Sequence, residues 1–452
     1  MKERILLFII ILLLTTFIYI FQSYTVWGLG IFVFLVALYA ISVMIAGKIK
    51  QLFKEEKKSS EYQPFVSIMI PAHDEESVIT STIETVLKLN YPQYELIVID
   101  DRSSDNTASV IKDAQQKYSN KVKALIRNKD SFPGKSAVLN DALKIAKGDA
   151  ILVLDADARI ETDFLTNLVK ELAPQNVGAV QARKVIVNKD ITILTRCQNN
   201  EMTLDTYLQC SRNSVKGGVE LRGNGELIKR VALEDIGGWN NYTITDDLDM
   251  STRLHIKGWD VRFCKDTIVY EEGIMYLFPL YRQRRRWLEG TIRRYLEYFN
   301  DILTSPKMSL RVRLDMIAYI SEFIMPAWFI IELGILILKI IIRGAQPHVL
   351  LSSVIMGGII GIGYMLGCFY SLVKYDKLPV KKAFSESIET SLYLLLIWFP
   401  LVLFIGTKIL FMKKDMNWGK TAHGLILHEH AILRAKRKIK EAKEELKKLL
   451  KK

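Results

Sequence analysis

The sequence predicts an α/β domain flanked by membrane-spanning helices, and three observations carry this prediction. Apolar runs long enough to cross a bilayer stand near both ends of the chain, around a middle part of different pattern. In that middle part, short apolar stretches alternate with helix-like stretches. Hydrophobic residues make up 50% of the 452 residues and charged residues 25%, a mixture that favours a soluble domain joined to a membrane part.

The N-terminal segment, residues 1–50, is expected to form a transmembrane hairpin from Ile5–Phe21 and Val26–Ala46. Each run is about long enough to cross ~30 Å of hydrocarbon. A signal peptide is the alternative for the first run, but no A-x-A-like cleavage site follows it. The connector QSYT is uncharged whereas KIKQLFKEEKK follows the second run, so the positive-inside rule places both ends of the hairpin in the cytoplasm.

The middle part, residues 64–290, alternates between strand-like and helix-like stretches. The predicted strands are FVSIMIP, YELIVIDD, KVKALIRN, DAILVLDAD and VGAVQARKVI, and the predicted helices are EESVITSTIETVLKL, SDNTASVIKDAQQKY, KSAVLNDALKIAK and TDFLTNLVKEL. Apolar strands that alternate with helices are typical of a parallel sheet covered on both faces. Ligands of such sheets bind beyond the carboxyl ends of the strands, so we expect the site near residues 71–73, 100–101 and 155–157.

Apolar runs return at Phe323–Leu338, Val349–Val373 and Ser391–Leu410, within an expected C-terminal membrane region of residues 316–411. Pro326 and Pro400 should kink or interrupt their helices. Interfacial helices are expected over the preceding residues, 291–315.

The basic tail, residues 412–452, is expected in the cytoplasm. Three C-terminal spans would place it outside, against the positive-inside rule, so we expect one of the three runs to be re-entrant or interfacial. Residues 427–452 have a basic amphipathic pattern that suits either an anionic lipid surface or a solvated helix.

Carboxylates stand where the predicted strands end. Asp155 and Asp157 are spaced i, i+2, so both point to the same side of an extended segment and can share a hard divalent cation. Mg²⁺ or Mn²⁺ there would neutralise a diphosphate leaving group, although a lone D-x-D is often only structural. The sequence has no G-x-G-x-x-G or P-loop, which argues against a dinucleotide or Walker-type ATP site.

A second acidic cluster, TDDLD, begins a helix-like pattern near Thr245. Threonine or aspartate at such a place can simply cap a helix. We expect one aspartate to cap and a neighbour to face the cleft as a general base, which needs reach to an acceptor hydroxyl.

Taken together, these motifs resemble the family 2 glycosyltransferases, inverting enzymes of the GT-A nucleotide-diphospho-sugar transferase fold. The matching stretches occur in the family order, as IMIPAHDEE, VIDDRSSDNT, FPGKSAVLN, DADA, ELRGNGE, TDDLD and QRRRW. The resemblance implies an enzyme. A catalytically silent membrane subunit that binds nucleotide or lipid is the alternative, and the intact acidic motifs argue against it.

The resemblance also implies residue roles. The residues expected to bind the UDP-sugar or the acceptor are Pro71, His73, Glu75, Asp101, Lys135, Asp155, Gly223, Asn224, Gly225, Gln283, Arg286 and Trp287. Asp155 and Asp157 would bind Mg²⁺ or Mn²⁺, Asp157 more directly. Asp247 would be the catalytic base, and Asp246 is the alternative.

The net charge of +13 predicts an acidic partner, for which phospholipid, nucleic acid and nucleotide phosphate all qualify. The resemblance makes Arg286 of the Q-x-x-R-W motif a bidentate diphosphate clamp and Trp287 a flat face for a sugar ring. The neighbouring cations expected to contact lipid phosphates are Arg284, Arg285, Arg293 and Arg294. Nucleic acid is not an expected partner.

Two kinds of acceptor remain open. The Q-x-x-R-W motif and a W-x-x-T-like segment at Trp418–His423 are similar to those of processive β-glycan synthases, which would use UDP-N-acetylglucosamine in a polymer of that sugar. The stretches GGVELRGNGELIKR and TITDDLDMSTRLHIKGW look closer to membrane glucolipid synthases, which glucosylate diacylglycerol once. We expect the lipid acceptor with UDP-glucose, and a polyprenyl phosphate is a further alternative. The apolar runs and the positive-inside rule predict a multi-pass protein of the cell (plasma) membrane with a cytoplasmic catalytic domain.

Overall fold

The computed structural model describes residues 2–53, 62–344, 347–412 and 414. Its helices and strands, in chain order, are α1 (Lys2–Phe53), β1 (Val66–Ala72), α2 (Ile79–Leu87), β2 (Tyr94–Asp100), α3 (Thr107–Lys117), β3 (Val122–Ile126), α4 (Lys135–Leu143), β4 (Ala150–Val153), β5 (Arg159–Ile160), α5 (Phe164–Leu172), β6 (Val177–Ile186), α6 (Ile193–Ser214), β7 (Glu226–Lys229), α7 (Arg230–Asp235), α8 (Asp246–Ile256), β8 (Asp260–Glu271), α9 (Leu277–Glu297), α10 (Phe299–Thr304), α11 (Leu310–Arg343), α12 (Pro347–Tyr375) and α13 (Val380–Phe411).

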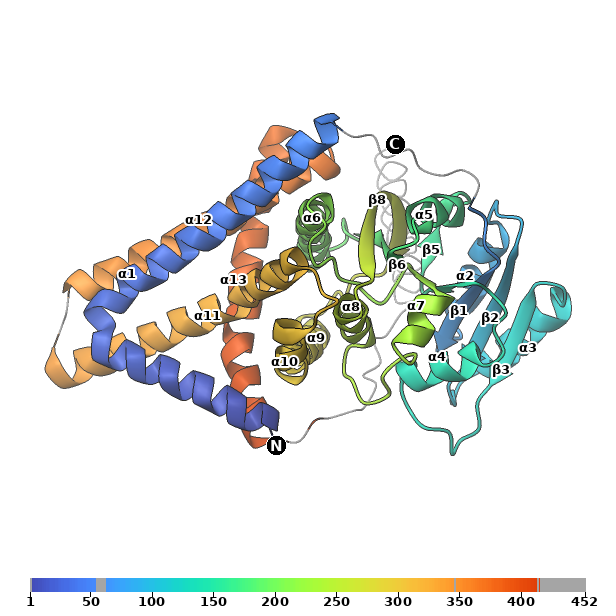
Figure 1. Cartoon of the computed structure of the whole chain (residues 1–452), viewed down its shortest axis with the longest axis horizontal. Helices are drawn as coiled ribbons and strands as arrows, with labels where there is room; N and C mark the ends of the chain where they lie inside the picture. The colour runs from blue at the N-terminus through green and yellow to red at the C-terminus, as the bar shows by residue number, and fades with distance from the viewer. Residues whose placement is uncertain (1, 54–61, 345–346, 413, 415–452) are drawn as a thin grey trace, which may run out of the picture.

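The molecule has a sheet domain on one side and long helices on the other (Figure 1). The sheet and its covering helices lie at the right of the view, and α1, α11, α12 and α13 lie at the left. Between these two parts lie α6, α8, α9 and α10. Any site at the inner edge of the sheet therefore faces the long helices.

The sheet has eight strands in the order β3-β2-β1-β4-β7-β6-β8-β5. The first four strands in this order run parallel, but β7 pairs antiparallel with both β4 and β6. The prediction of strand and helix positions is confirmed for β1 to β4 and β6, whereas a wholly parallel sheet is wrong. The chain leaves β6 through the long helix α6 and returns in the opposite direction as β7, which inserts between β4 and β6.

The strands are apolar throughout because both faces of the sheet are covered. On β1, Ile68 and Ile70 belong to the core shared with α2, α3 and α5, whereas Met69 belongs to the core shared with α4, α7 and α8. All three side chains are fully buried, and burial of each stabilises the fold by about 1.5–3 kcal/mol. The two cores hold β1 and β4 in fixed register, with Val66–Met69 beside Ala150–Val153.

Four segments of the described chain are long and apolar enough to cross a membrane, judged by length and composition. They are Glu3–Phe21, Leu310–Ile342, Gly357–Tyr375 and Val380–Phe411. The three predicted C-terminal runs lie within α11, α12 and α13.

The segment predicted to form an N-terminal hairpin is α1, which consists of two helical arms joined at a kink. Its backbone is non-helical at Phe21 (φ −109°, ψ 24°), and the connector expected at residues 22–25 is helical. The two arms of α1 diverge from this bend in Figure 1. The connector contains neither glycine nor proline, so nothing in its residues ends the helix.

Both prolines predicted to disturb the C-terminal spans, Pro326 and Pro400, lie inside helices that continue past them. The segment Trp418–His423 and the amphipathic pattern of residues 427–452 lie outside the described residues.

Candidate active site

A cavity of about 430 Å³ opens at the carboxyl ends of β1 and β4 and extends to the long helices. Most of the residues expected to form the site line it, namely Pro71, His73, Glu75, Lys135, Asp155, Asp157, Gly223, Asp246, Asp247, Gln283, Arg286 and Trp287. The other three, Asp101, Asn224 and Gly225, are not among its lining residues. Asp101 and Asn224 instead contact residues that do line it, His73 and Asp155, whereas the backbone of Gly225 bonds to Val153 and Ala182 of the sheet.

Asp101, expected to hold the uridine, has its carboxylate occupied by protein. Its side chain is fully buried, and Oδ1 accepts hydrogen bonds from Arg127 (2.6 Å) and Arg102 (2.8 Å). The backbone carbonyl of Asp101 lies 2.7 Å from Nδ1 of His73, which does line the cavity. Asp101 therefore does not line the cavity itself but helps to position His73, which does.

The two D-x-D carboxylates differ in their partners. Asp155 is half-buried and accepts a 2.6 Å hydrogen bond from Nζ of Lys135. Asp157 is buried, and its Oδ2 accepts the backbone N–H of Glu272 at 3.1 Å. Although burial opposes it, the charges of Asp155 and Asp246 raise the pKa of Lys135, so this lysine stays an ammonium. The two carboxylates thus line the cavity, and the ammonium group of Lys135 is bound beside them.

A second lysine, Lys184 of β6, lies in the same wall. It forms a 2.7 Å ion pair with Glu271 of β8. Burial would lower its pKa, but the charges of Glu271 and Asp155 raise it, so Lys184 is also charged. Sequence reasoning missed this residue, although two cations inside the strand-like stretch VQARKVI were a usable signal for buried acidic partners.

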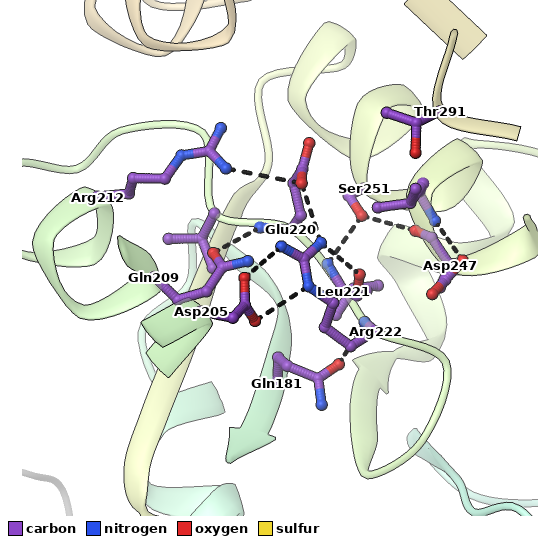
Figure 2. Close-up of polar contacts among 12 residues, drawn as sticks. Gln181, Asp205, Gln209, Arg212, Glu220, Leu221, Arg222, Asp247, Ser251 and Thr291 are labelled. Carbon is purple, nitrogen blue, oxygen red and sulfur yellow. Dashed lines mark hydrogen bonds and ion pairs between the residues drawn. The ribbon is translucent and has the colours of Figure 1, made fainter. Parts of the chain in front are cut away.

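Residues 218–225 form a loop that contacts Lys135 and Asp155 and is linked to Asp247 through Ser251. We call it the central loop. Figure 2 shows its start, where Glu220 lies beside Arg212 and Arg222. Its carboxylate is 2.8 Å from Arg294 of α9, 2.9 Å from Arg222 and 3.6 Å from Arg212 of α6. Arg222 extends the cluster to Asp205 of α6 at 2.7 Å.

The end of the central loop contacts Lys135 and Asp155. The carbonyl of Gly223 accepts a 2.7 Å hydrogen bond from Lys135, and Oδ1 of Asn224 accepts the backbone N–H of Asp155 at 3.1 Å. Gly223 has φ +78°, which favours glycine, and a Cβ there would lie 3.2 Å from Oδ2 of Asp247. The backbone of the loop can therefore approach both acidic motifs closely.

Asp247 stands in the first turn of α8. The expected side-chain cap is absent: Thr245 at the N-cap makes no cap hydrogen bond with its side chain, and Oδ1 of Asp247 accepts the N–H of Leu248 at 2.8 Å instead. The hydroxyl of Ser251 donates to the carbonyl of Asp247 (2.6 Å) and accepts the N–H of Leu221 (2.9 Å), as Figure 2 shows. These bonds tie α8 to the central loop.

The electrostatics around Asp247 favour its protonated form. Burial and the neighbouring Asp246 raise the pKa of Asp247 from its ordinary value of 3.8 to about 6, against opposing contributions from the Leu248 N–H, Lys135 and Arg222. Oδ2 of Asp246 is buried and has no hydrogen-bond partner among the described residues. The cavity therefore concentrates negative charge next to its lysines.

Three arginines expected to contact lipid lie inside the protein. Arg284 is 2.7 Å from Glu201, Arg293 is 3.0 Å from Glu289, and Arg294 is bound to Glu220. All three are buried, so the prediction of lipid contact is wrong for them. The reason is that α9 packs against α8, α13 and α1, which enclose these side chains. Arg285 is half-buried.

The far part of the cavity is apolar and belongs largely to the long helices. The residues that form it include Tyr319, Phe323 and Pro326 of α11, Tyr364 of α12, and Leu394, Trp398, Phe399 and Val402 of α13. Sequence reasoning missed these residues. An apolar residue in a membrane-like run has the same sequence pattern whether it lines a cavity or faces lipid. Met202, Leu204 and Leu208 of α6 continue this apolar wall.

The family model described as "Glycosyltransferase like family 2" matches residues 63–290, about half of the chain. Among curated proteins, the chain is 35% identical to the β-monoglucosyldiacylglycerol synthase of Trichormus variabilis over 380 residues, which is 81% of this chain and 78% of the relative. It is 29% identical to the poly-β-1,6-N-acetyl-D-glucosamine synthase of Staphylococcus epidermidis over 281 residues, 59% of this chain and 66% of the relative.

Among solved structures, the chain is similar to the mannosyltransferase PcManGT from Pyrobaculum calidifontis, determined with GDP-Man and Mn²⁺. The TM-score is 0.59 at 19% identity, over 85% of this chain and 99% of the other, which establishes a common fold. The eight-stranded sheet, the matched domain and the extent of the sequence similarity agree, and the chain belongs to the family 2 glycosyltransferases, with the GT-A fold predicted from its motifs.

Proposed function

We propose that this glycosyltransferase transfers one glucosyl group from UDP-glucose to the hydroxyl of diacylglycerol, with inversion. The observation that carries the proposal is the composition of the cavity wall. Carboxylates and lysines suit a nucleotide sugar, and the aromatic and aliphatic side chains of α11, α12 and α13 suit acyl chains. Similarity to β-monoglucosyldiacylglycerol synthases over most of the chain supports this acceptor.

The donor would bind where the sheet carries the charged residues. Pro71 at the end of β1, together with His73 and Glu75 just after it, would contact the uridine. Lys135 would bind the diphosphate together with Arg286, whose planar guanidinium can donate two parallel hydrogen bonds to phosphate oxygens. Both side chains line the cavity, and Lys135 is charged.

Asp247 would act as the general base. Its carboxylate would accept the proton of the acceptor hydroxyl while that oxygen forms a bond to the anomeric carbon and UDP leaves from the opposite face. One such displacement inverts the anomeric centre. Asp246, beside it in the same wall, is the alternative base.

Asp155 and Asp157 would hold a divalent cation, Mg²⁺ or Mn²⁺. The donor set fits, because carboxylate oxygens are the ligands that such hard cations prefer. In the described part of the chain, no three His, Cys, Asp or Glu side chains gather closely enough to hold a metal by themselves. The remaining ligands would be diphosphate oxygens and water, and the cation would stabilise the charge of the leaving group.

The proposed organisation follows from this chemistry. Residues 64–290 would be the cytoplasmic catalytic domain, residues 1–50 and 316–411 would lie in the cell membrane, residues 291–315 would lie at its surface, and the basic tail, residues 412–452, would lie in the cytoplasm. The four apolar helical segments and the positive-inside rule support this arrangement. The acceptor would then enter the cavity from the bilayer, and membrane lipids would surround the long helices.

The size of the product separates this proposal from polymer synthesis, which the similarity to a poly-β-1,6-N-acetyl-D-glucosamine synthase keeps as a second candidate. Purified protein in detergent would be given radiolabelled UDP-glucose or UDP-N-acetylglucosamine, with and without diacylglycerol. We expect label from UDP-glucose in a lipid that carries one hexose by mass spectrometry. Label in a polymer, or transfer that does not need diacylglycerol, would contradict the proposal.

The pH profile tests the base. Only the ionised carboxylate of Asp247 can accept a proton, and its pKa is raised to about 6. We expect kcat/KM to fall by about tenfold per unit as pH decreases below ~6, and Asp247→Asn to lose about 10²-fold or more. Circular dichroism at each pH would control for unfolding. If kcat/KM fell only near the ordinary aspartate pKa of 3.8, or if Asp247→Asn stayed active, Asp246 would be the base instead.

Metal dependence tests Asp157. Chelation with EDTA should abolish transfer, and Asp157→Ala should raise the metal concentration needed for half-maximal activity, because a carboxylate ligand is lost. Asp266→Ala is the matched control, since the Asp266 side chain is 71% exposed and forms an ion pair with the neighbouring Lys265. Full transfer in excess EDTA would exclude the proposed role of the cation.

A further inference from the structure

Glu201 of α6 stands in the cavity wall and accepts hydrogen bonds from two other helices. Its Oε1 accepts the indole N–H of Trp398 at 2.8 Å. Its Oε2 accepts from Nη2 of Arg284 at 2.7 Å and from the hydroxyl of Tyr393 at 3.0 Å. One carboxylate therefore joins α6 to α9 and to α13, and its side chain is only 12% exposed.

The same carboxylate holds a second indole through Arg284. The guanidinium of Arg284 lies 4.1 Å from the ring centroid of Trp287 and 6.0 Å from that of Trp398. Its Nη1 donates to Oε1 of Gln283 at 2.6 Å. Arg284 is fully buried, so this stacking is shielded from water and is stronger than it would be at the surface.

Two tryptophans from different helices are thus oriented by one acidic residue. Trp287, Trp398, Gln283 and Glu201 all line the cavity, whereas Arg284, which connects them, does not. Trp398 stands beside Phe399 among the apolar lining residues of α13, and Trp287 belongs to the Q-x-x-R-W motif of α9. The pair therefore marks the place where the polar wall of the cavity changes to the apolar wall.

We infer that Glu201 is a positioning residue that sets acceptor affinity and selectivity, by holding Trp287 and Trp398 against the part of the lipid that joins the reacting hydroxyl to the acyl chains. This inference rests on the proposed function. Flat indole faces suit that part of a glycerolipid, because they offer apolar area without a polar group that would need a partner. Glu201 does not itself need to touch the lipid.

A purely structural role for Glu201 makes a different prediction, and the chain offers a matched control. Arg196 of α6 pairs with Glu389 of α13 at 3.0 Å, so it also joins these two helices, but neither residue lines the cavity. If Glu201 only joined helices, Glu201→Gln and Glu389→Gln would each affect thermal unfolding and leave acceptor kinetics alone.

The test compares Glu201→Gln, Trp398→Phe, the double variant and Glu389→Gln as full-length proteins in detergent. Glutamine keeps the shape but has no charge and only one acceptor oxygen, so it cannot accept from Arg284 and Trp398 as the two carboxylate oxygens do, and phenylalanine keeps an aromatic ring without the N–H. We expect Glu201→Gln to raise the KM for diacylglycerol about tenfold or more, with a much smaller change in the KM for UDP-glucose. Trp398→Phe should raise the same KM, and the double variant should show less than the product of the two effects.

Selectivity supplies a second readout. The wild-type enzyme should prefer diacylglycerol strongly over a monoacylglycerol of the same acyl chain, and Glu201→Gln should reduce this preference, while Glu389→Gln should keep it. An unchanged acceptor KM and unchanged selectivity in Glu201→Gln would overturn the inference. Should that variant fail to fold, an unchanged acceptor KM in Trp398→Phe would overturn it equally.

Activity of the wild-type enzyme separates a failure of the proposed function from a failure of the role of Glu201. A wild-type enzyme that transfers no sugar to diacylglycerol overturns the proposed function and this inference with it. A wild-type enzyme that makes the glucolipid, with variants that keep its acceptor KM, overturns only the role of Glu201.

Discussion

The buried carboxylate of Glu220 is the charge on which the rest of the site depends. Burial alone would raise its pKa, but Arg294, Arg212 and Arg222 hold the pKa of Glu220 well below its ordinary value, so it stays ionised. Arg212 in turn pairs with Asp315 of α11 at 2.7 Å. Removing one partner from such a cluster costs about 3–5 kcal/mol, because the charges left behind remain buried and unpaired. The cluster therefore fixes the central loop against α6, α9 and α11 together.

The central loop in turn positions Asp247, Lys135 and Asp155. The loop backbone contacts Lys135 through the carbonyl of Gly223 and is linked to Asp247 through Ser251, and the side chain of Asn224 accepts the backbone N–H of Asp155. Donor binding, metal binding and proton transfer would then share one rigid support. The aromatic wall of the cavity is held by a different carboxylate, that of Glu201, so under the proposed function acceptor selectivity could change without disturbance of the charged part of the cavity.

Sequence reasoning was most successful where the chemistry is local. The end of β4 and Asp155 with Asp157 are contiguous in sequence, so an apolar run followed by carboxylates predicted both the strand and the position of these residues. It failed where partners are distant: Glu220 and Arg294 are 74 residues apart, and Glu201 and Trp398 are 197 apart. A row of arginines in α9 has the same sequence pattern whether it faces lipid headgroups or buried acids. The direction of β7 likewise depends on where α6 returns the chain, which no local pattern specifies.

The most direct test of this account is the turnover of Glu220→Gln at a temperature well below its own unfolding midpoint. Glu234→Gln is the control, because the Glu234 side chain is 58% exposed in its pair with Arg230 and should behave as wild type. The account predicts a lowered unfolding midpoint together with a large loss of kcat in the folded variant, since the loop that positions Asp247 and Lys135 is no longer held. A folded Glu220→Gln enzyme with wild-type kcat would contradict it, because the site would then be positioned without the buried charge cluster.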